Sequence, residues 1–169
     1  CRTFNSFGNQ YIRNIAKVIY ETKSDRWYWE EQMETALNRA GVNLRSMQIA
    51  RGSNPIAEFL KHHARVRAGL VAPDAITVEL ESYGAENNPM IPFGPIEVEL
   101  GKLQIASQTQ SFDDQIYLAV VDLLANPTRR NAMQHRFEHV VVDEFQDLNP
   151  AQLALIDILS RPHRSLFVV

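Results

Sequence analysis

The 169-residue chain can bury a sizeable core in one or two domains, and its 45% hydrophobic and 22% charged residues are ordinary for a soluble globular protein. Its single cysteine, Cys1, excludes an internal disulfide framework and a cysteine zinc cluster, and no apolar run approaches the roughly 20 residues that span a membrane. The net charge of -3 combines a basic part, residues 1–70, with 11 Lys and Arg against 6 Asp and Glu, and an acidic part, residues 71–169, with 6 against 14.

The first predicted element is a helix that begins near Thr3. The hydroxyl and amide side chains of Thr3, Asn5 and Ser6 are typical of a helix N-cap. The same groups also bind phosphates, and Phe4 between them can stack on a base. Apolar residues then recur with helical spacing at Ile12, Ile15, Ala16 and Ile19. The segment therefore predicts a capped helix, with nucleic-acid contact as the alternative role of its first turn.

A second helix is predicted from Trp27 to Gly41, because a glycine suits the C-cap position. Its apolar residues are Tyr28, Trp29, Met33, Ala36, Leu37 and Ala40. Three adjacent aromatic residues can stack on bases. The large area that aromatic rings bury favours a place in the core or in an interface.

A third helix begins at Asn54-Pro55, an N-cap followed by a proline in the first turn, and continues to Gly69. One face holds Ile56, Phe59, Leu60 and His63. The remaining positions form the most basic segment of the chain, with Lys61, His62, Arg65 and Arg67. This basic surface is either a solvated helix face or a surface that lies along a DNA backbone.

Residues 71–110 carry two conflicting signals. Apolar and polar residues alternate at 76–80 and again at 96–100, as they do in strands, and the stretch from Gly84 to Pro95 predicts a loop. Pro73-Asp74 is also typical of a helix start. We expect a helix after Pro73, leave residues 96–106 open between helix and strand, and keep a β-hairpin within residues 76–105 as an alternative.

Ser111 and Asp114 approximate a capping box, which predicts the start of an apolar helix that ends at Asn126-Pro127. The acids Asp113 and Asp114 are interpreted as caps. The buried face of this helix is expected at Ile116, Ala119, Val120, Leu123 and Leu124. Residues 128–138 are expected to connect it to the next strand.

The run Val140–Val142 is entirely β-branched and predicts a short buried strand. Four polar residues follow it within five positions: Asp143, Glu144, Gln146 and Asp147. Ionised carboxylates are costly to bury, so acids where an apolar strand ends indicate a metal ion or a proton to be moved. In open α/β sheets, ligands bind at this end of the strands. The alternative is that these acids are solvated or cap the next helix.

The next helix is predicted to begin at Asn149-Pro150 and a further buried strand is predicted at Ser165–Val169. The apolar face of the helix is expected at Leu153, Leu155, Ile156 and Leu159. The order of strand, acidic turn, helix and strand suits a nucleotide-hydrolysing site. In such a site one carboxylate holds Mg²⁺ and its neighbour activates the attacking water.

Eight contiguous residues, Val142 to Asn149, resemble the Walker B segment of UvrD/Rep-like superfamily 1 DNA helicases, which have a VDEFQD-T/L-N-x-x-Q pattern. The resemblance implies that Asp143 coordinates Mg²⁺ and that Glu144 activates the attacking water. It further implies that Gln146 senses the nucleotide phosphates. Asp147 is implied to link neighbouring motifs in a supporting role.

The resemblance extends to two further segments. Thr3, Phe4, Asn5 and Ser6 are similar to the family's TFHS-F/L segment, which contacts single-stranded DNA, with Asn5 at the position of the histidine. Residues 111–115 are similar to its D-F-D-D-L segment, which gives Asp113 and Asp114 supporting roles. The implied fold class is α/β. Residues 1–22 and 108–169 would form part of a RecA-like (P-loop NTPase) parallel sheet with helices, and residues 23–107 an inserted, mainly helical subdomain.

No G-x-x-x-x-G-K-[ST] motif occurs in the chain, so a Walker A loop to cradle nucleotide phosphates is absent and no cofactor-binding residue is assigned. We interpret the chain as a fragment of an ATP-dependent DNA helicase or translocase that uses Mg²⁺ and ATP in the complete protein. The isolated fragment is expected to be inactive as an ATPase. The alternative is a non-catalytic DNA-binding or protein-interaction module that retains a Walker B-like segment.

The expected partners are single-stranded and duplex DNA, ATP and the remainder of the helicase chain, without a membrane. An incomplete sheet exposes an edge that invites dimerisation. The single cysteine and the resemblance together favour a reducing cytoplasm, with the protein on DNA as in a bacterial nucleoid.

Overall fold

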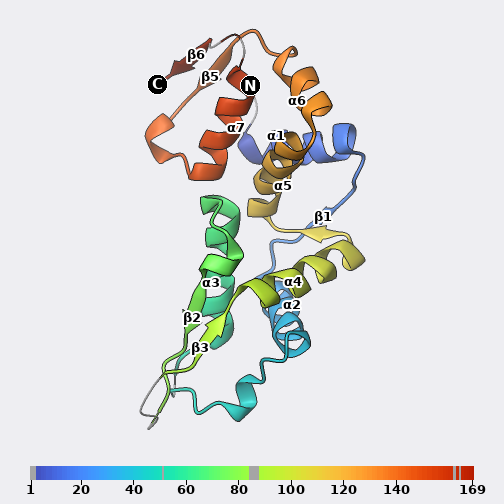
Figure 1. Ribbon diagram of the computed structural model, residues 1–169. Coiled ribbons are helices and arrows are strands. Elements are labelled where there is room, and N and C mark those ends of the chain that lie inside the picture. The colour runs from blue at the N-terminus through green and yellow to red at the C-terminus, as the bar shows by residue number, and fades with distance from the viewer. Residues whose placement is uncertain (1–2, 51, 84–87, 162, 164) are drawn as a thin grey trace. The chain divides into compact units, whose positions relative to one another are not determined.

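The computed structural model describes residues 3–50, 52–83, 88–161, 163 and 165–169 (Figure 1). It is a mixed α/β structure in which long helices accompany strands of two or three residues. The chain divides into two compact units. Unit 1 holds Cys1–Tyr20, Arg67–Leu70 and Ser111–Val169, and unit 2 holds Glu21–Val66 and Val71–Gln110. Within the described ranges, no helix combines the length and the apolar character that crossing a membrane requires.

The helices of unit 1 pack on α5, which extends over Phe112–Ala125. They are α1 (Phe4–Tyr11), its continuation in a π-helical turn (Ile12–Ala16), α6 (Pro127–Gln134) and α7 (Pro150–Ser160). Their common core contains Tyr11, Ile12, Ile116, Ala119, Val120, Leu123, Met133, Ala151, Leu155, Ile158 and Leu159. A Cβ at Gly8 would come within 2.3 Å of the Gln115 carbonyl oxygen, so the close approach of α1 to α5 requires a glycine there.

Capping signals in the sequence set the starts of these helices, and the three predicted caps are confirmed. Thr3 Oγ1 accepts a hydrogen bond of 3.2 Å from the backbone N–H three residues later. Ser111 and Asp114 form a complete capping box at the start of α5. Asn149 and Gln152 form a second one at the start of α7. Each cap satisfies backbone N–H groups that have no partner inside their helix.

The segment 127–134 is a helix, α6, whereas the sequence analysis assigned it to a connection. Asn126 caps it by accepting a hydrogen bond of 3.2 Å from the Arg129 backbone N–H, and Pro127 occupies its first turn. The Asn-Pro pair therefore ends one helix and begins the next. The expected apolar faces also need correction, since Leu124 is 57% exposed and Leu153 is 38% exposed.

The two strands of unit 1, β5 (Val140–Val142) and β6 (Leu166–Val168), pair in parallel with Val141 opposite Phe167. Their prediction as strands is confirmed, but their prediction as buried strands is wrong. Val142 is 5% exposed, whereas Val141 is 70% exposed and every residue of β6 is exposed. In the described part of the chain, α7 packs against β5 and leaves the other face of this small sheet open.

Unit 2 contains α2 (Arg26–Arg39), most of α3 (Pro55–Gly69), α4 (Gly94–Ser107) and 3₁₀ turns at Leu44–Ser46 and Pro73–Ala75. Two short ladders complete it. β1 (Glu21–Thr22) pairs in parallel with β4 (Thr109–Gln110), and β2 (Thr77–Glu79) pairs antiparallel with β3 (Met90–Pro92). Its most buried large side chains are Met33, Leu37, Phe59, Phe93, Ile96 and Leu100.

Residues 96–106, left open by the sequence, are helical, so the strand reading of 96–100 is wrong. Ile96, Leu100 and Leu103 are buried with a helical spacing of three to four residues, and Val98 between them is 58% exposed. Three alternating positions fit a helix as well as a strand, because residues four apart share a face in both. Only burial against the rest of unit 2 distinguishes the two.

The expected helix after Pro73 is limited to one 3₁₀ turn, after which the chain enters β2. The alternative hairpin does form, although its second strand is β3 and not residues 96–100. β3 lies inside the stretch from Gly84 to Pro95 that was predicted as a loop. Residues 84–87 of that loop lie outside the described part of the chain.

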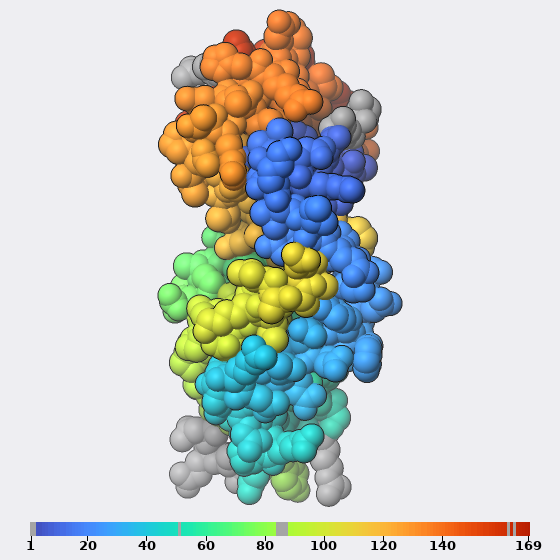
Figure 2. Space-filling model, turned by 90° about the vertical axis from the view of Figure 1, so that its right-hand side faces the viewer, coloured from blue at the N-terminus to red at the C-terminus, as the bar shows by residue number. Residues whose placement is uncertain are grey.

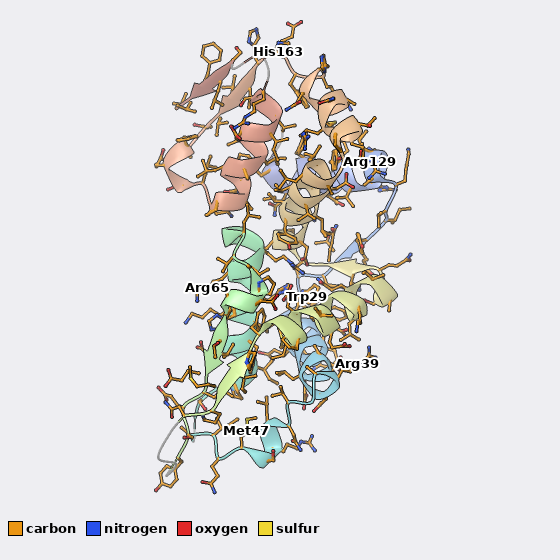
Figure 3. The ribbon with its side chains drawn as sticks, viewed as in Figure 1. Trp29, Arg39, Met47, Arg65, Arg129 and His163 are labelled. Atoms are coloured by element: carbon orange, nitrogen blue, oxygen red, sulfur yellow. The ribbon has the colours of Figure 1, made fainter. Side chains whose placement is uncertain are left out.

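The core interpretation of the aromatic cluster is correct for Trp29 and wrong for Trp27. Trp29 is 8% exposed, stands between the helices of unit 2 (Figure 3), and donates a hydrogen bond of 2.9 Å from Nε1 to the Lys23 carbonyl oxygen. Its ring stacks on His63, whose Nδ1 lies 2.8 Å from Glu97 Oε2. Trp27 is 72% exposed.

Arg67 is a buried anchor within unit 1, which corrects its assignment to the basic surface of α3. It is 6% exposed, and its Nε donates a hydrogen bond of 2.5 Å to Asp114 Oδ1. Its guanidinium carbon lies 4.3 Å from the centre of the Tyr117 ring, an arrangement that adds a cation–π attraction. On the same helix, burial and then the Arg65 guanidinium lower the pKa of His62 below its ordinary value, which disfavours its charged form.

We expect Arg67→Met to lower the free energy of unfolding by about 3–5 kcal/mol, because it leaves the Asp114 carboxylate buried without its cation. Urea denaturation followed by circular dichroism measures this change. The matched control is Arg65→Met on the same helix, where the side chain is exposed and a change within about 0.5 kcal/mol is expected. Equal midpoints for the two variants would contradict the assigned role of Arg67.

Candidate functional site

The acidic turn that follows β5 is the candidate site. β5 ends at Val142, Asp143 follows it, and Glu144 has φ 53, in the left-handed region. A 3₁₀ turn at Phe145–Asp147 then leads to the cap of α7. The turn thus presents its carboxylates at the carboxyl end of a parallel strand and just before a helix, which is where α/β sheets bind ligands.

Backbone hydrogen bonds hold this turn against the end of β6. The Phe145 N–H donates to the Val169 carbonyl oxygen at 3.1 Å, and the Val169 N–H donates to the Val142 carbonyl oxygen at 2.9 Å. The Glu144 N–H donates to its neighbour Asp143 at Oδ1, over 3.1 Å. The turn therefore has a defined backbone path, although all four of its polar side chains are exposed.

Glu144 and Gln146 form the side-chain contact of the turn. Gln146 Nε2 donates a hydrogen bond to Glu144 Oε2 and leaves the other carboxylate oxygen open to solvent. A carboxylate oriented in this way can accept a proton from a water molecule that lies against it. The left-handed backbone of Glu144 costs about 1–3 kcal/mol for a residue other than glycine, and conformations of this kind cluster at functional sites.

The oxygen donors of the turn fit a magnesium ion. Mg²⁺ prefers oxygen ligands and usually keeps several water molecules while one or two carboxylates and the phosphates of a substrate complete its shell. Asp143 offers an exposed carboxylate of this kind at the strand end. Among the described residues, no group of three or more His, Cys, Asp or Glu side chains is arranged to hold a metal ion.

The alternative interpretation makes Asp147 and Asn149 helix caps and leaves Asp143 and Glu144 solvated. The cap is confirmed for Asn149 and wrong for Asp147, and the exposure of Asp143 and Glu144 agrees with the solvated interpretation. Asn149 Oδ1 accepts the hydrogen bond of 2.9 Å from the Gln152 backbone N–H that begins α7. Asp147 is the last residue of the 3₁₀ turn, which precedes the N-cap Asn149, and it is exposed. Its carboxylate and those of Asp143 and Glu144 therefore all remain available outside the cap.

The predicted DNA-contacting residues lie in the first turn of α1. Thr3 and Ser6 are exposed, and the Thr3 hydroxyl oxygen caps the helix. Phe4 is half-buried against the core of unit 1, and Asn5 is half-buried. The capping interpretation of this segment is confirmed. In the described residues, no hydrogen bond joins this group to the acidic turn.

The supporting acids differ from each other. Asp114 is 1% exposed; its Oδ2 accepts from the Ser111 backbone N–H, and its Oδ1 accepts from Arg67. The main role of Asp114 is therefore structural, because its carboxylate takes part both in the capping box of α5 and in a buried ion pair. Asp113 is exposed on the same turn.

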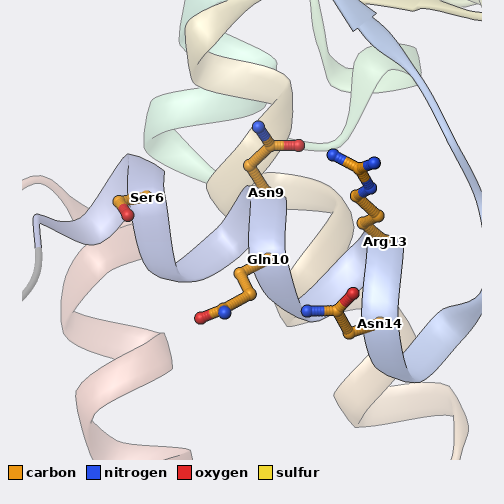
Figure 4. A pocket seen from close by; sticks show the side chains of 5 residues that line it. All are labelled: Ser6, Asn9, Gln10, Arg13 and Asn14. Carbon is orange, nitrogen blue, oxygen red and sulfur yellow. The ribbon is translucent and has the colours of Figure 1, made fainter.

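A polar pocket on α1 and its π-helical turn joins Ser6 to four residues to which the sequence analysis gave no role. Ser6, Asn9, Gln10, Arg13 and Asn14 line it, and their side chains stand on one side of the helix and its π-helical turn (Figure 4). The available signal was the recurrence of polar residues every three or four positions after Ser6.

Known proteins resemble the chain over its whole length. A family model described as the UvrD/REP helicase N-terminal domain matches residues 1–169. A probable DNA helicase II homolog of Mycoplasma genitalium is 25% identical over 170 residues, which cover 99% of this chain and 24% of the relative. The chain therefore spans about a quarter of the length of that relative.

Two further relatives match shorter stretches of the chain. The ATP-dependent DNA helicase PcrA of Leuconostoc citreum is 36% identical over 63 residues, or 37% of this chain and 8% of the relative. The putative ATP-dependent DNA helicase YjcD of Bacillus subtilis is 33% identical over 58 residues, or 34% of this chain and 8% of the relative.

If the left-handed backbone at Glu144 is strained, Glu144→Gly should be more stable than Glu144→Ala by about 1 kcal/mol. Both changes remove the same carboxylate, but only glycine adopts positive φ without steric cost. Thermal unfolding of the two variants in parallel measures the difference. An alanine variant as stable as the glycine variant would show that the turn stores no strain.

Proposed function

This chain belongs to the UvrD/REP helicase N-terminal domain family, and from that membership we propose that it is part of an ATP-dependent DNA helicase or translocase. The complete protein would couple ATP hydrolysis to movement on single-stranded DNA and to unwinding of the duplex. The observation that carries the proposal is the exposed acidic turn between β5 and the capped helix α7, with Glu144 hydrogen-bonded by Gln146.

Each residue of the acidic turn receives a role in this proposal. Asp143 would hold Mg²⁺, which when bound neutralises charge on the nucleotide phosphates. Glu144 would take a proton from the attacking water through its open carboxylate oxygen. Gln146 would fix the orientation of Glu144 and sense the nucleotide phosphates through the same amide. Asp147 would link the turn to neighbouring segments.

We further propose that the two parts of the chain have different roles. Residues 1–22 and 108–169 would form part of a RecA-like ATPase domain, in which β5, α7 and β6 are one strand–helix–strand repeat. Residues 23–107 would form an inserted, mainly helical subdomain. The boundaries between unit 1 and unit 2 near residues 20 and 110 support this division, whereas Arg67–Leu70 belong to unit 1 and depart from it.

The exposed residues of β5 and β6 form a surface on which the remainder of the helicase chain would pack. Val141 and Phe167 are 70% and 58% exposed, which leaves apolar surface that a larger sheet would cover. Additional strands and helices of the complete protein would bury this surface. In the isolated chain the same surface would favour dimerisation.

In the full-length protein, Glu144→Gln should lower the DNA-stimulated ATPase rate by about 10²–10⁴-fold, because the amide cannot accept the proton of the attacking water. A coupled phosphate-release assay measures the rate, and nucleotide-binding affinity should stay within about threefold of the wild type. Asp157→Asn, an exposed carboxylate on α7 outside the turn, is the control and should leave the rate unchanged. Wild-type activity in Glu144→Gln would instead favour the non-catalytic binding module.

The isolated 169-residue chain should not hydrolyse ATP, because it contains no phosphate-cradling loop and that loop supplies much of the binding energy for the β- and γ-phosphates. The measurement is phosphate release from Mg-ATP with purified chain at several concentrations. Turnover that Asp143→Ala abolishes would contradict this prediction and place a complete site within the chain.

A further inference from the structure

The polar pocket of α1 has the composition of a site for a phosphate-bearing strand. Its five lining residues, Ser6, Asn9, Gln10, Arg13 and Asn14, supply a hydroxyl, three amides and one guanidinium, and none of them is an acid. Figure 4 shows Asn9 and Arg13 along one edge of the pocket and Gln10 and Asn14 along the other, with Ser6 at one end. Side chains of this kind make most hydrogen bonds to phosphate and sugar groups in protein–DNA complexes.

The charge around the pocket is uniformly favourable to an anion. Residues 1–20 contain no Asp or Glu. Arg13 and Lys17 are exposed, and among the described residues Arg13 forms no ion pair. The Asp122 carboxylate of α5 accepts a hydrogen bond of 2.6 Å from the Tyr11 hydroxyl, and its charge is paired with Arg129 Nη1 at 2.6 Å. An approaching phosphate therefore meets one free guanidinium and no opposing free carboxylate in this segment.

The packing of unit 1 holds this polar face outward. On the opposite side of α1, Tyr11 and Ile12 are 2% and 4% exposed in the core, and Gly8 touches the backbone of α5. The helix therefore cannot rotate about its axis without losing that contact. Figure 2 shows the dark blue atoms of this first segment exposed on one face, beside the orange atoms of α6. A rigidly held face loses little conformational freedom on binding.

The π-helical turn gives a second, independent indication of function. Residues 12–16 wind as a π-helix and end at Lys17, which has φ 62 in the left-handed region. Single π-helical turns are rare and frequently lie at functional sites. This turn carries Arg13 and Asn14, two of the five lining residues. The irregular backbone therefore falls where the pocket gains its only charged group.

We propose that this face of α1 binds the sugar–phosphate backbone of single-stranded DNA, with Arg13 on a phosphate and the amides of Gln10 and Asn14 on neighbouring phosphate or sugar oxygens. The inference rests on the proposed function, because it extends the DNA segment Thr3–Ser6 along the helix. The contacts are to the backbone and to no base edge, so binding here is independent of sequence. A guanidinium suits this role because its planar N–H groups match phosphate oxygens.

The test is the affinity of the full-length protein for labelled single-stranded DNA, measured by fluorescence anisotropy without nucleotide over a range of salt concentrations. Arg13→Gln should weaken binding roughly fivefold to tenfold at low salt. It should also reduce the slope of log affinity against log salt by about 0.7, the value for one lost phosphate contact on a single strand. Arg39→Gln, an exposed arginine on α2 (Figure 3), is the control and should change neither quantity.

A second pair of variants adds a charge instead of removing one. Asn14→Asp places a carboxylate in the pocket and should weaken binding, whereas Asn131→Asp, an equally exposed asparagine on α6, should not. The loss should be the same on oligo(dT) and on a mixed sequence of equal length. The inference would be overturned if the loss of affinity depended on the base sequence. It would also be overturned if Arg13→Gln and Asn14→Asp bound DNA as tightly as their control variants.

These outcomes are separable from failure of the proposed function. If the pocket variants bind DNA normally while Glu144→Gln still abolishes ATP hydrolysis, the inference fails and the helicase assignment stands. If the wild-type protein has no affinity for single-stranded DNA at low salt, both fail. The inference would also be overturned if the protein bound duplex DNA more tightly than single-stranded DNA and Arg13→Gln lowered the affinity for the duplex alone.

Discussion

The buried pair of Arg67 and Asp114 is the constraint on which unit 1 depends. Asp114 uses one carboxylate oxygen to complete the capping box of α5 and the other to bind Arg67. Because both groups are almost inaccessible to water, the loss of either one removes an ion-pair partner from a buried charge. α5 is the helix on which α1, α6 and α7 pack, so this pair fixes the position of the helix that supports every candidate functional group in unit 1.

The acidic turn shows how a small amount of backbone structure can present reactive groups. Parallel pairing of β5 and β6 and the capping box of α7 fix the turn at both ends. The conformational cost falls on Glu144, which adopts positive φ so that the chain can pass from strand to helix within a few residues. Its carboxylate is thereby placed beside Gln146 and open to solvent, as the proposed role of a general base needs.

The basic residues that are exposed on the structure are not those that are densest in the sequence. α3 carries the densest run of basic residues. However, Arg67 is buried in an ion pair with Asp114, and burial lowers the pKa of His62. The π-helical turn after α1 carries Arg13 and ends at Lys17; both are exposed, and residues 1–20 contain no Asp or Glu. The proposed contact of Arg13 with a phosphate rests on its exposure and on the absence of Asp and Glu from residues 1–20 rather than on a high count of basic residues.

The sequence by itself determined the features that depend on near neighbours. The caps at Thr3, Ser111 and Asn149 and the strand at Val140–Val142 follow from side-chain and backbone groups a few residues apart. The Walker B-like pattern also needed no structure, since it is a contiguous run of residue types. Tertiary structure decided the burial of Arg67, the helical state of residues 94–107 and the exposure of β6. These depend on contacts between segments far apart in the chain, and neither local propensity nor periodicity records which surfaces will meet.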